Sequence, residues 1–217
     1  GKPVDRKEWH MTPPTVNAYY NPQMNDINFP AGILQPPFFD PEMPAAVNLG
    51  GIGMVIGHEL THGFDDSGRK FDLNGNMNDW WSAADATAFE SRAQCFVEQY
   101  GAYEVLPGVK LNGKLTLGEN TADNGGLLVA GLAVDKLPGA ADTWQGFTPR
   151  QLLYLGFSQV WCQNRTEQTA RMLAQVDSHS AARERVIGPL SNSAEFAKAF
   201  SCKPGDPMVA PKACRVW

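Results

Sequence analysis

The sequence is poor in basic residues and in long apolar runs, and both shortages narrow the functions open to it. Among 217 residues, 18 lysines and arginines are outnumbered by 23 aspartates and glutamates, and the formal net charge is -5. Such a chain offers no basic field to a phosphate backbone, so we expect no nucleic-acid partner. The longest apolar run, residues 127–134, is far shorter than the roughly 20 residues that span a bilayer. We therefore expect no membrane segment in this chain.

Cysteine is also scarce, and the four that occur lie far apart: Cys95, Cys162, Cys202 and Cys214. None shows the close pairing that is typical of zinc knuckles or redox motifs. An even number slightly favours disulfides and an oxidising compartment. The alternative is four buried thiols in a cytosolic protein.

Residues 1–44 contain nine of the sixteen prolines, which excludes long helices there. Two short β-favouring segments, residues 15–20 and 26–30, predict a hairpin at the edge of a sheet. The chain also starts without an apolar signal core. We therefore expect its numbering to begin inside a larger protein.

From residue 45 onward the pattern becomes helical. A buried apolar helix is predicted over 47–64, and Ser82 with Asp85 indicates a capping box that opens the next helix. Thr148 followed by proline is another start signal. The further helices are expected over residues 82–100, 117–137, 149–163, 166–176 and 193–200. We therefore predict one catalytic domain over 1–217, mainly α with a small β-sheet (α+β), in which 1–44 is extended and 45–217 is mainly helical.

The strongest chemical signal is the pentapeptide HELTH at residues 58–62. His58 and His62 are four residues apart, so on a helix they lie one turn apart on the same face. Two imidazoles in this arrangement suit zinc, which binds nitrogen ligands and in catalytic sites keeps one position for water. Glu59 then lies beside that water as a general base.

The third ligand must come from elsewhere in the chain. A metzincin would place glycine at 65 and histidine at 68, where this sequence has Asp65 and Gly68, so that subclass is excluded. The remaining candidates are His10, His179 or a distant carboxylate.

Glu119 and Asp123 form the best carboxylate pair, because they are four residues apart at the start of a predicted helix. One of them could ligate the metal while the other holds a histidine ring. The alternative is an acidic first turn that complements the helix dipole, and the spacing alone does not decide between the two.

Several motifs in order resemble one family of zinc peptidases. They are NAYYNP at 17–22, FPAGILQPPFF at 29–39, HELTH at 58–62, ENTADNGG at 119–126, DSHSAARERV at 177–186 and the terminal CRVW at 214–217. This set resembles the neprilysin and endothelin-converting enzyme family, including the bacterial oligopeptidase O group. The resemblance implies a thermolysin-like zincin catalytic domain whose active-site helix carries HExxH.

The resemblance also implies roles for single residues. It implies one zinc ion per chain, held by His58, His62 and Glu119, with Glu59 as the catalytic base. Asp123 matches the acidic residue that orients a zinc-bound histidine.

Further positions match residues that contact the substrate. His179 matches a histidine that stabilises the oxyanion, with Asp177 as partner of its ring, and Arg185 matches an arginine that binds a substrate carbonyl or carboxylate. Asn17 and Ala18 match a strand that pairs with the substrate backbone. An apolar pocket for a large hydrophobic residue on the C-terminal side of the cleaved bond matches Ile33, Phe38, Met54, Val55, Val160 and Trp161. The implied function is a zinc metalloendopeptidase that hydrolyses short peptides.

Family members are much longer than this chain, and their upstream helical half closes over the cleft. We therefore expect the C-terminal catalytic portion of a larger enzyme, with an upstream helical segment or chain as partner. The resemblance pairs Cys95 with Cys214 and gives Cys162 and Cys202 partners in the upstream half. It implies an extracellular, periplasmic or cell-surface location, although a bacterial member could be cytoplasmic.

Two other functions compete with this one. A binding module could keep zinc for stability without doing chemistry, but a purely structural site needs neither Glu59 nor His179. An aminopeptidase is the second alternative, but the sequence contains no G-x-M-E-N-type motif for a substrate amine.

Overall fold

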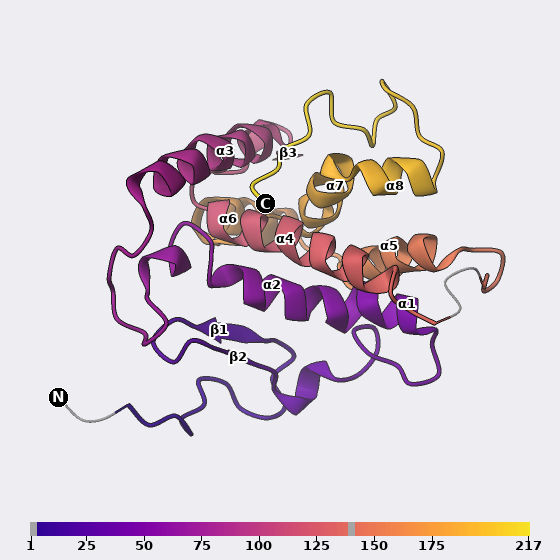
Figure 1. Ribbon diagram of the computed structural model, residues 1–217. Helices are drawn as coiled ribbons and strands as arrows, with labels where there is room; N and C mark the ends of the chain where they lie inside the picture. The colour runs from indigo at the N-terminus through magenta and orange to yellow at the C-terminus, as the bar shows by residue number, and fades with distance from the viewer. Residues whose placement is uncertain (1–3, 139–141) are drawn as a thin grey trace.

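The structure is a computed structural model that describes residues 4–138 and 142–217. Two helices at its centre, α2 (Met54–His62) and α4 (Leu117–Val134), lie side by side (Figure 1). Helix α1 (Ala45–Asn48) and a π-helical turn, Leu49–Gly53, lead without a break into α2. The expected buried helix is therefore present, with a wider turn in its glycine-rich first half.

Glycines allow α2 and α4 to approach backbone to backbone. A Cβ on Gly57 would lie 2.9 Å from the Cα of Gly126, and a Cβ on Gly126 would lie 2.6 Å from the backbone nitrogen of His58. Both distances are too short for any side chain. Gly126 is unfavourable in a helix interior by propensity, so close packing explains its place in α4.

The hairpin predicted near the N-terminus is confirmed. Strands β1 (Tyr19–Asn21) and β2 (Asp26–Asn28) pair antiparallel, with Tyr20 opposite Ile27, and the hairpin packs against α2 (Figure 1). Asn25 in the turn has a φ of 50°, a left-handed conformation that asparagine adopts more readily than most residues.

The predicted helices after α2 are also present, several with their predicted caps. The Ser82 side chain accepts the backbone N–H of Asp85, and Thr148 forms a capping box with Gln151. These helices are α3 (Ala83–Ala102), α5 (Pro149–Gln159), α6 (Glu167–Val176) and α8 (Ala194–Ala199).

Two elements were not predicted. Helix α7 (Ala182–Asn192) has no side-chain cap at its start and contains Pro189, so local signals argue against it. It forms because one face packs on α4 and α3. The second is a hairpin of β3 (Glu104–Leu106) and β4 (Val109–Lys110). The fold is thus mainly α with two separate small antiparallel sheets in the described residues, where a single sheet was expected.

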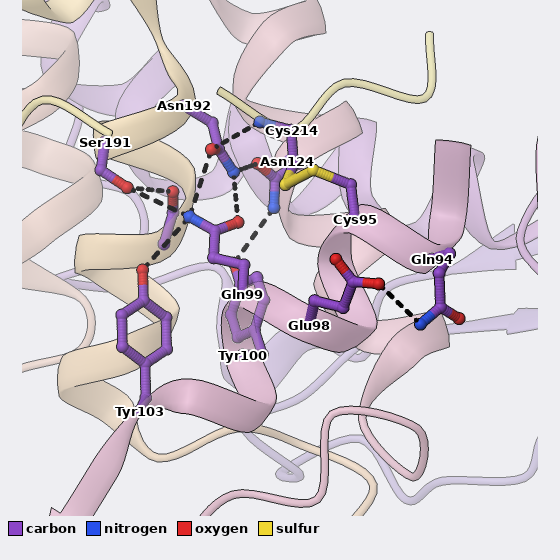
Figure 2. Close-up of a disulfide and its surroundings, with 11 residues drawn as sticks. Gln94, Cys95, Glu98, Gln99, Tyr100, Tyr103, Asn124, Ser191, Asn192 and Cys214 are labelled. Atoms are coloured by element: carbon purple, nitrogen blue, oxygen red, sulfur yellow. Dashed lines mark hydrogen bonds between the residues drawn. A yellow bond between two sulfur atoms is a disulfide. The ribbon is translucent and has the colours of Figure 1, made fainter. Parts of the chain in front are cut away.

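A disulfide and a cluster of amides join α3, α4, α7 and the C-terminal segment (Figure 2). The Cys95–Cys214 bond is present, which confirms the predicted pairing. Asn192 accepts the backbone N–H of Cys214 and donates to the side chains of Gln99 and Asn124. Cys162 and Cys202 have no disulfide partner among the described residues. In the same part of the chain, no helix is both long and apolar enough to cross a bilayer.

Candidate active site

The C-terminal half of α2 presents two histidine rings to one point. His58 and His62 pack edge to face with ring centroids 4.6 Å apart, and their Nε2 atoms are 3.0 Å apart. Both residues lie on the face of α2 that is turned toward α4, so the helix spacing places the rings as the motif predicts.

The first turn of α4 brings a carboxylate to the same point. Glu119 Oε2 lies 3.3 Å from Nε2 of His58 and 3.5 Å from Nε2 of His62. This oxygen is buried and has no hydrogen-bond partner in the described residues. A buried acceptor without a partner is costly, so the site is arranged for a group that would satisfy it.

The other nitrogen of each ring is held by an aspartate. Nδ1 of His58 lies 2.8 Å from Asp123 Oδ1, and Nδ1 of His62 lies 2.7 Å from Asp65 Oδ2. In a neutral imidazole one nitrogen carries the proton, and the carboxylates place that proton on Nδ1. Each Nε2 then presents a lone pair toward the other and toward Glu119, so only a cation between them satisfies all three atoms.

The donor set and its dimensions fit zinc. Three ligands about 2.0–2.1 Å from a zinc ion at tetrahedral angles lie roughly 3.3–3.4 Å from one another, and the three separations here are 3.0, 3.3 and 3.5 Å. Glu59 is also within 4.8 Å of both histidines. Of the two glutamates, Glu119 has the shorter distances to both rings and the unpaired oxygen, so it is the better third ligand.

The pKa shifts agree with a site that favours positive charge. Burial lowers the pKa of His62, but the hydrogen bond to Asp65 and the nearby carboxylate of Glu119 outweigh burial and raise it to about 10. For Glu119 burial raises the pKa, and the closeness of His58 and His62 reverses this, leaving it well below its usual value. Burial raises the pKa of Glu59, with the two histidines opposing.

The two histidines and Glu119 open onto a cavity of about 520 Å³ between α2 and the β1–β2 hairpin. This volume is within the range of small-ligand sites, roughly 300–1,000 Å³. The predicted residues that line it are Asn17, Ala18, Ile33, Phe38, Met54, Val55, Glu59, Trp161, His179 and Arg185. The structure thus gathers an apolar wall and several polar groups around the histidine pair.

His179 reaches the cavity from the loop between α6 and α7. Its Nε2 lies 3.3 Å from Glu119 Oε2, and its Nδ1 lies 2.9 Å from Asp177 Oδ1. The Asp177 contact leaves Nε2 as the ring atom that faces the site.

Arg185 is buried and lies on α7, a helix that the sequence did not predict. Its Nε and one amino group donate to the two carboxylate oxygens of Asp123 at 2.8 and 2.7 Å. The guanidinium stands over the ring of Trp161, 3.9 Å from the centroid. Asp123 therefore joins Arg185 to His58, and this pairing could not be foreseen without α7.

Some predicted residues are not brought to the cavity. Val160 is the C-terminal cap of α5 and does not line the cavity, because the chain turns there and presents Trp161 instead. His10 is exposed, and its Nε2 faces the amide of Asn21. Sequence reasoning missed Asp65 as the partner of His62; its only signal was a carboxylate three residues after the motif.

Comparison with known proteins decides the family. The sequence pattern of Peptidase family M13 matches residues 17–216. This chain belongs to peptidase family M13. It is 51% identical to human endothelin-converting enzyme 1, covering 100% of this chain and 29% of that protein. It is 48% identical to Neprilysin-3 of Drosophila melanogaster, covering 100% of this chain and 28% of that protein. The chain therefore spans under a third of the length of these M13 relatives.

Solved structures of M13 proteins have the same fold. Zinc metalloprotease Zmp1 of Mycobacterium tuberculosis, in complex with an inhibitor, superimposes with a TM-score of 0.93 at 44% identity, covering 100% of this chain and 34% of that one. PepO from Lactobacillus rhamnosis gives a TM-score of 0.87 at 37% identity, covering 95% and 32%. The expected family and the zincin-type fold are thereby confirmed.

Proposed function

We propose that this chain supplies the zinc site and the substrate cleft of a metalloendopeptidase that hydrolyses short peptides. The observation that carries the proposal is the convergence of His58 Nε2, His62 Nε2 and an unpaired Glu119 oxygen within 3.0–3.5 Å of one another. Membership of family M13, whose members are zinc peptidases, supports the same function.

His58, His62 and Glu119 would hold one zinc ion per chain, and Asp123 would keep the His58 ring in the ligating tautomer. A zinc ion bound there would polarise the substrate carbonyl and lower the pKa of a bound water to about 7. Glu59 takes the proton of the attacking water and then delivers it to the leaving amine. The buried environment that raises the pKa of Glu59 suits a carboxylate that must accept and release a proton.

As an imidazolium, which carries a proton on each ring nitrogen, His179 donates from Nδ1 to Asp177 and from Nε2 to the developing oxyanion of the substrate. One fixed donor of this kind is commonly worth about 2.7–4 kcal/mol of transition-state stabilisation, so His179 should affect turnover more than substrate affinity. Arg185 binds a substrate carbonyl or terminal carboxylate through the part of its guanidinium that Asp123 does not occupy.

The walls of the cavity support a preference among substrates. In the described residues β1 pairs only with β2, so the chain at Asn17 and Ala18 beside it is free to bind a peptide backbone as an added strand. Apolar side chains line the cavity beside the histidines: Ile33, Phe38, Met54, Val55 and Trp161. A large hydrophobic residue on the C-terminal side of the cleaved bond fits there.

Exposed apolar side chains support a covering partner. Ile56 and Leu60 are exposed one turn apart on α2, and Leu60 is 51% exposed; Phe64 is exposed in the turn that follows α2, and Leu132 on α4 is 61% exposed. We infer that an upstream helical segment or chain covers this surface, so the 217 residues alone should be weakly active. The Cys95–Cys214 disulfide supports a location outside the reducing cytosol.

The proposal is tested by measuring zinc content and cleavage of a panel of short peptides by the natural protein that carries this chain, with products identified by mass. We expect one zinc per chain, loss of cleavage on chelation, and cuts before large hydrophobic residues. Zinc binding without cleavage of any peptide would instead favour a binding module.

A further inference from the structure

The loop that carries His179, residues 177–181, joins α6 to α7. Within it, Asp177 Oδ1 accepts both the backbone N–H and the ring Nδ1–H of His179, each at 2.9 Å. Both contacts join residues of the same loop and stabilise its local conformation. They do not fix the distance between His179 and the residues of α2 and α4.

One hydrogen bond attaches this loop to α4. The hydroxyl of Ser180 donates to Oδ1 of Asn120 at 2.7 Å, and the two residues are 5% and 0% exposed. Asn120 follows Glu119, and Ser180 follows His179. His179 Nε2 also lies 3.3 Å from Glu119. Two adjacent residues of α4, Glu119 and Asn120, therefore contact two adjacent residues of the loop.

The Asn120 side chain is itself held by a second hydrogen bond, on the side away from Ser180. Its amide nitrogen donates to Oγ1 of Thr116 at 2.9 Å, and the Thr116 hydroxyl donates to the carbonyl of Asn112 at 3.1 Å. The amide cannot rotate without losing bonds on both sides, because its oxygen only accepts and its nitrogen only donates. Asn120 is thus a rigid acceptor for Ser180.

We propose that the hydrogen bond between Asn120 and Ser180 positions His179 for catalysis by fixing its loop at the first turn of α4. Asn120 and Ser180 are positioning residues, because neither lines the cavity. The inference rests on the proposed role of His179. A buried bond in this place is needed because the His179 side chain is 43% exposed and has little packing of its own.

The test compares Ser180→Ala with Thr121→Val in the natural, zinc-loaded protein. Thr121 is a matched control on the same turn of α4, since its hydroxyl is buried without a hydrogen-bond partner in the described residues. Misplacing a catalytic group by 1 Å can lower the reaction rate about 100-fold. Loss of a single hydrogen bond should displace His179 by less than that distance. We therefore expect Ser180→Ala to lower kcat about 10-fold with KM within about twofold, and Thr121→Val to change neither.

A double-mutant cycle and hydrogen exchange separate positioning from general damage. In a His179→Ala background, Ser180→Ala should lower kcat less than about twofold, and amides 177–181 should exchange faster in zinc-free Ser180→Ala than in zinc-free Thr121→Val. A 10-fold loss that persists without His179, or unchanged exchange, would overturn the inference. An impaired His179→Ala with a fully active Ser180→Ala would overturn the inference alone, whereas a fully active His179→Ala would overturn the proposed function itself.

Discussion

Replacing Gly126 with alanine should disturb the metal site although Gly126 is not one of its residues. The new Cβ would lie 2.6 Å from the backbone nitrogen of His58 and 2.7 Å from the carbonyl oxygen of Met54. Carbon atoms pack best near 3.5–4.0 Å, so α2 and α4 must separate by roughly an ångström there. Because α2 carries the two histidines and α4 carries Glu119, the separation lengthens the distances that suit zinc.

Two opposing effects set the size of the change in stability. Alanine is favoured over glycine in a helix interior by about 0.5–1 kcal/mol. Overpacking of a tight contact typically costs about 1–3 kcal/mol, and here the clash is with backbone that cannot rotate away. We therefore expect net destabilisation of about 1–2 kcal/mol together with weaker zinc binding.

Gly131→Ala is the matched control on the same helix. A Cβ there would meet only the end of the Arg150 side chain at 3.5 Å, so this variant should be as stable as the parent or slightly more so. Calorimetry gives the melting temperature, and competition with a chelator gives the zinc affinity. The packing argument fails if Gly126→Ala melts at or above the parent and binds zinc equally well.

Three further predictions concern other contacts. Asp65→Asn should lower zinc affinity about 10–100-fold in chelator competition; an unchanged affinity would show that its contact with the ligand ring is incidental. Arg185→Ala should raise KM more than it lowers kcat, most for peptides cleaved near a free C-terminus; equal losses on amidated and free peptides would contradict carboxylate recognition. In the isolated 217-residue chain, loss of the Cys95–Cys214 bond through Cys95→Ser should lower the free energy of unfolding by roughly 2–4 kcal/mol, whereas Cys162→Ser should leave the melting temperature unchanged, because Cys162 has no disulfide partner among the described residues.

Local signals were sufficient for much of the fold. The cap at Ser82 and the Thr148 capping box act within one helical turn, and the histidine pair depends only on helix geometry. Each of these could be predicted because the interacting groups are neighbours in sequence. Helix α7 could not, because Pro189 and an uncapped start oppose it and it depends on packing against neighbouring helices, α4 foremost.

The same distinction applies to the site. The wall that contains Trp161 was predicted by resemblance, but Val160 is not among the residues that line the cavity, because the chain turns at the end of α5 and Trp161 faces the cavity instead. Asp65 was not predicted as a partner of His62, because the contact between them depends on how the chain turns after α2. The pairing of Arg185 with Asp123 spans 62 residues and needs the helix that sequence reasoning did not find.

Zinc binding by two isosteric variants tests the central claim most directly, because two glutamates stand beside the histidine pair. Chelator competition should show that Glu119→Gln binds zinc more than about 100-fold more weakly than the parent. Glu59→Gln should bind zinc within a few-fold of the parent while losing peptide cleavage. Loss of zinc from Glu59→Gln with retention in Glu119→Gln would exchange the two roles and contradict the assignment of Glu119 as the third ligand.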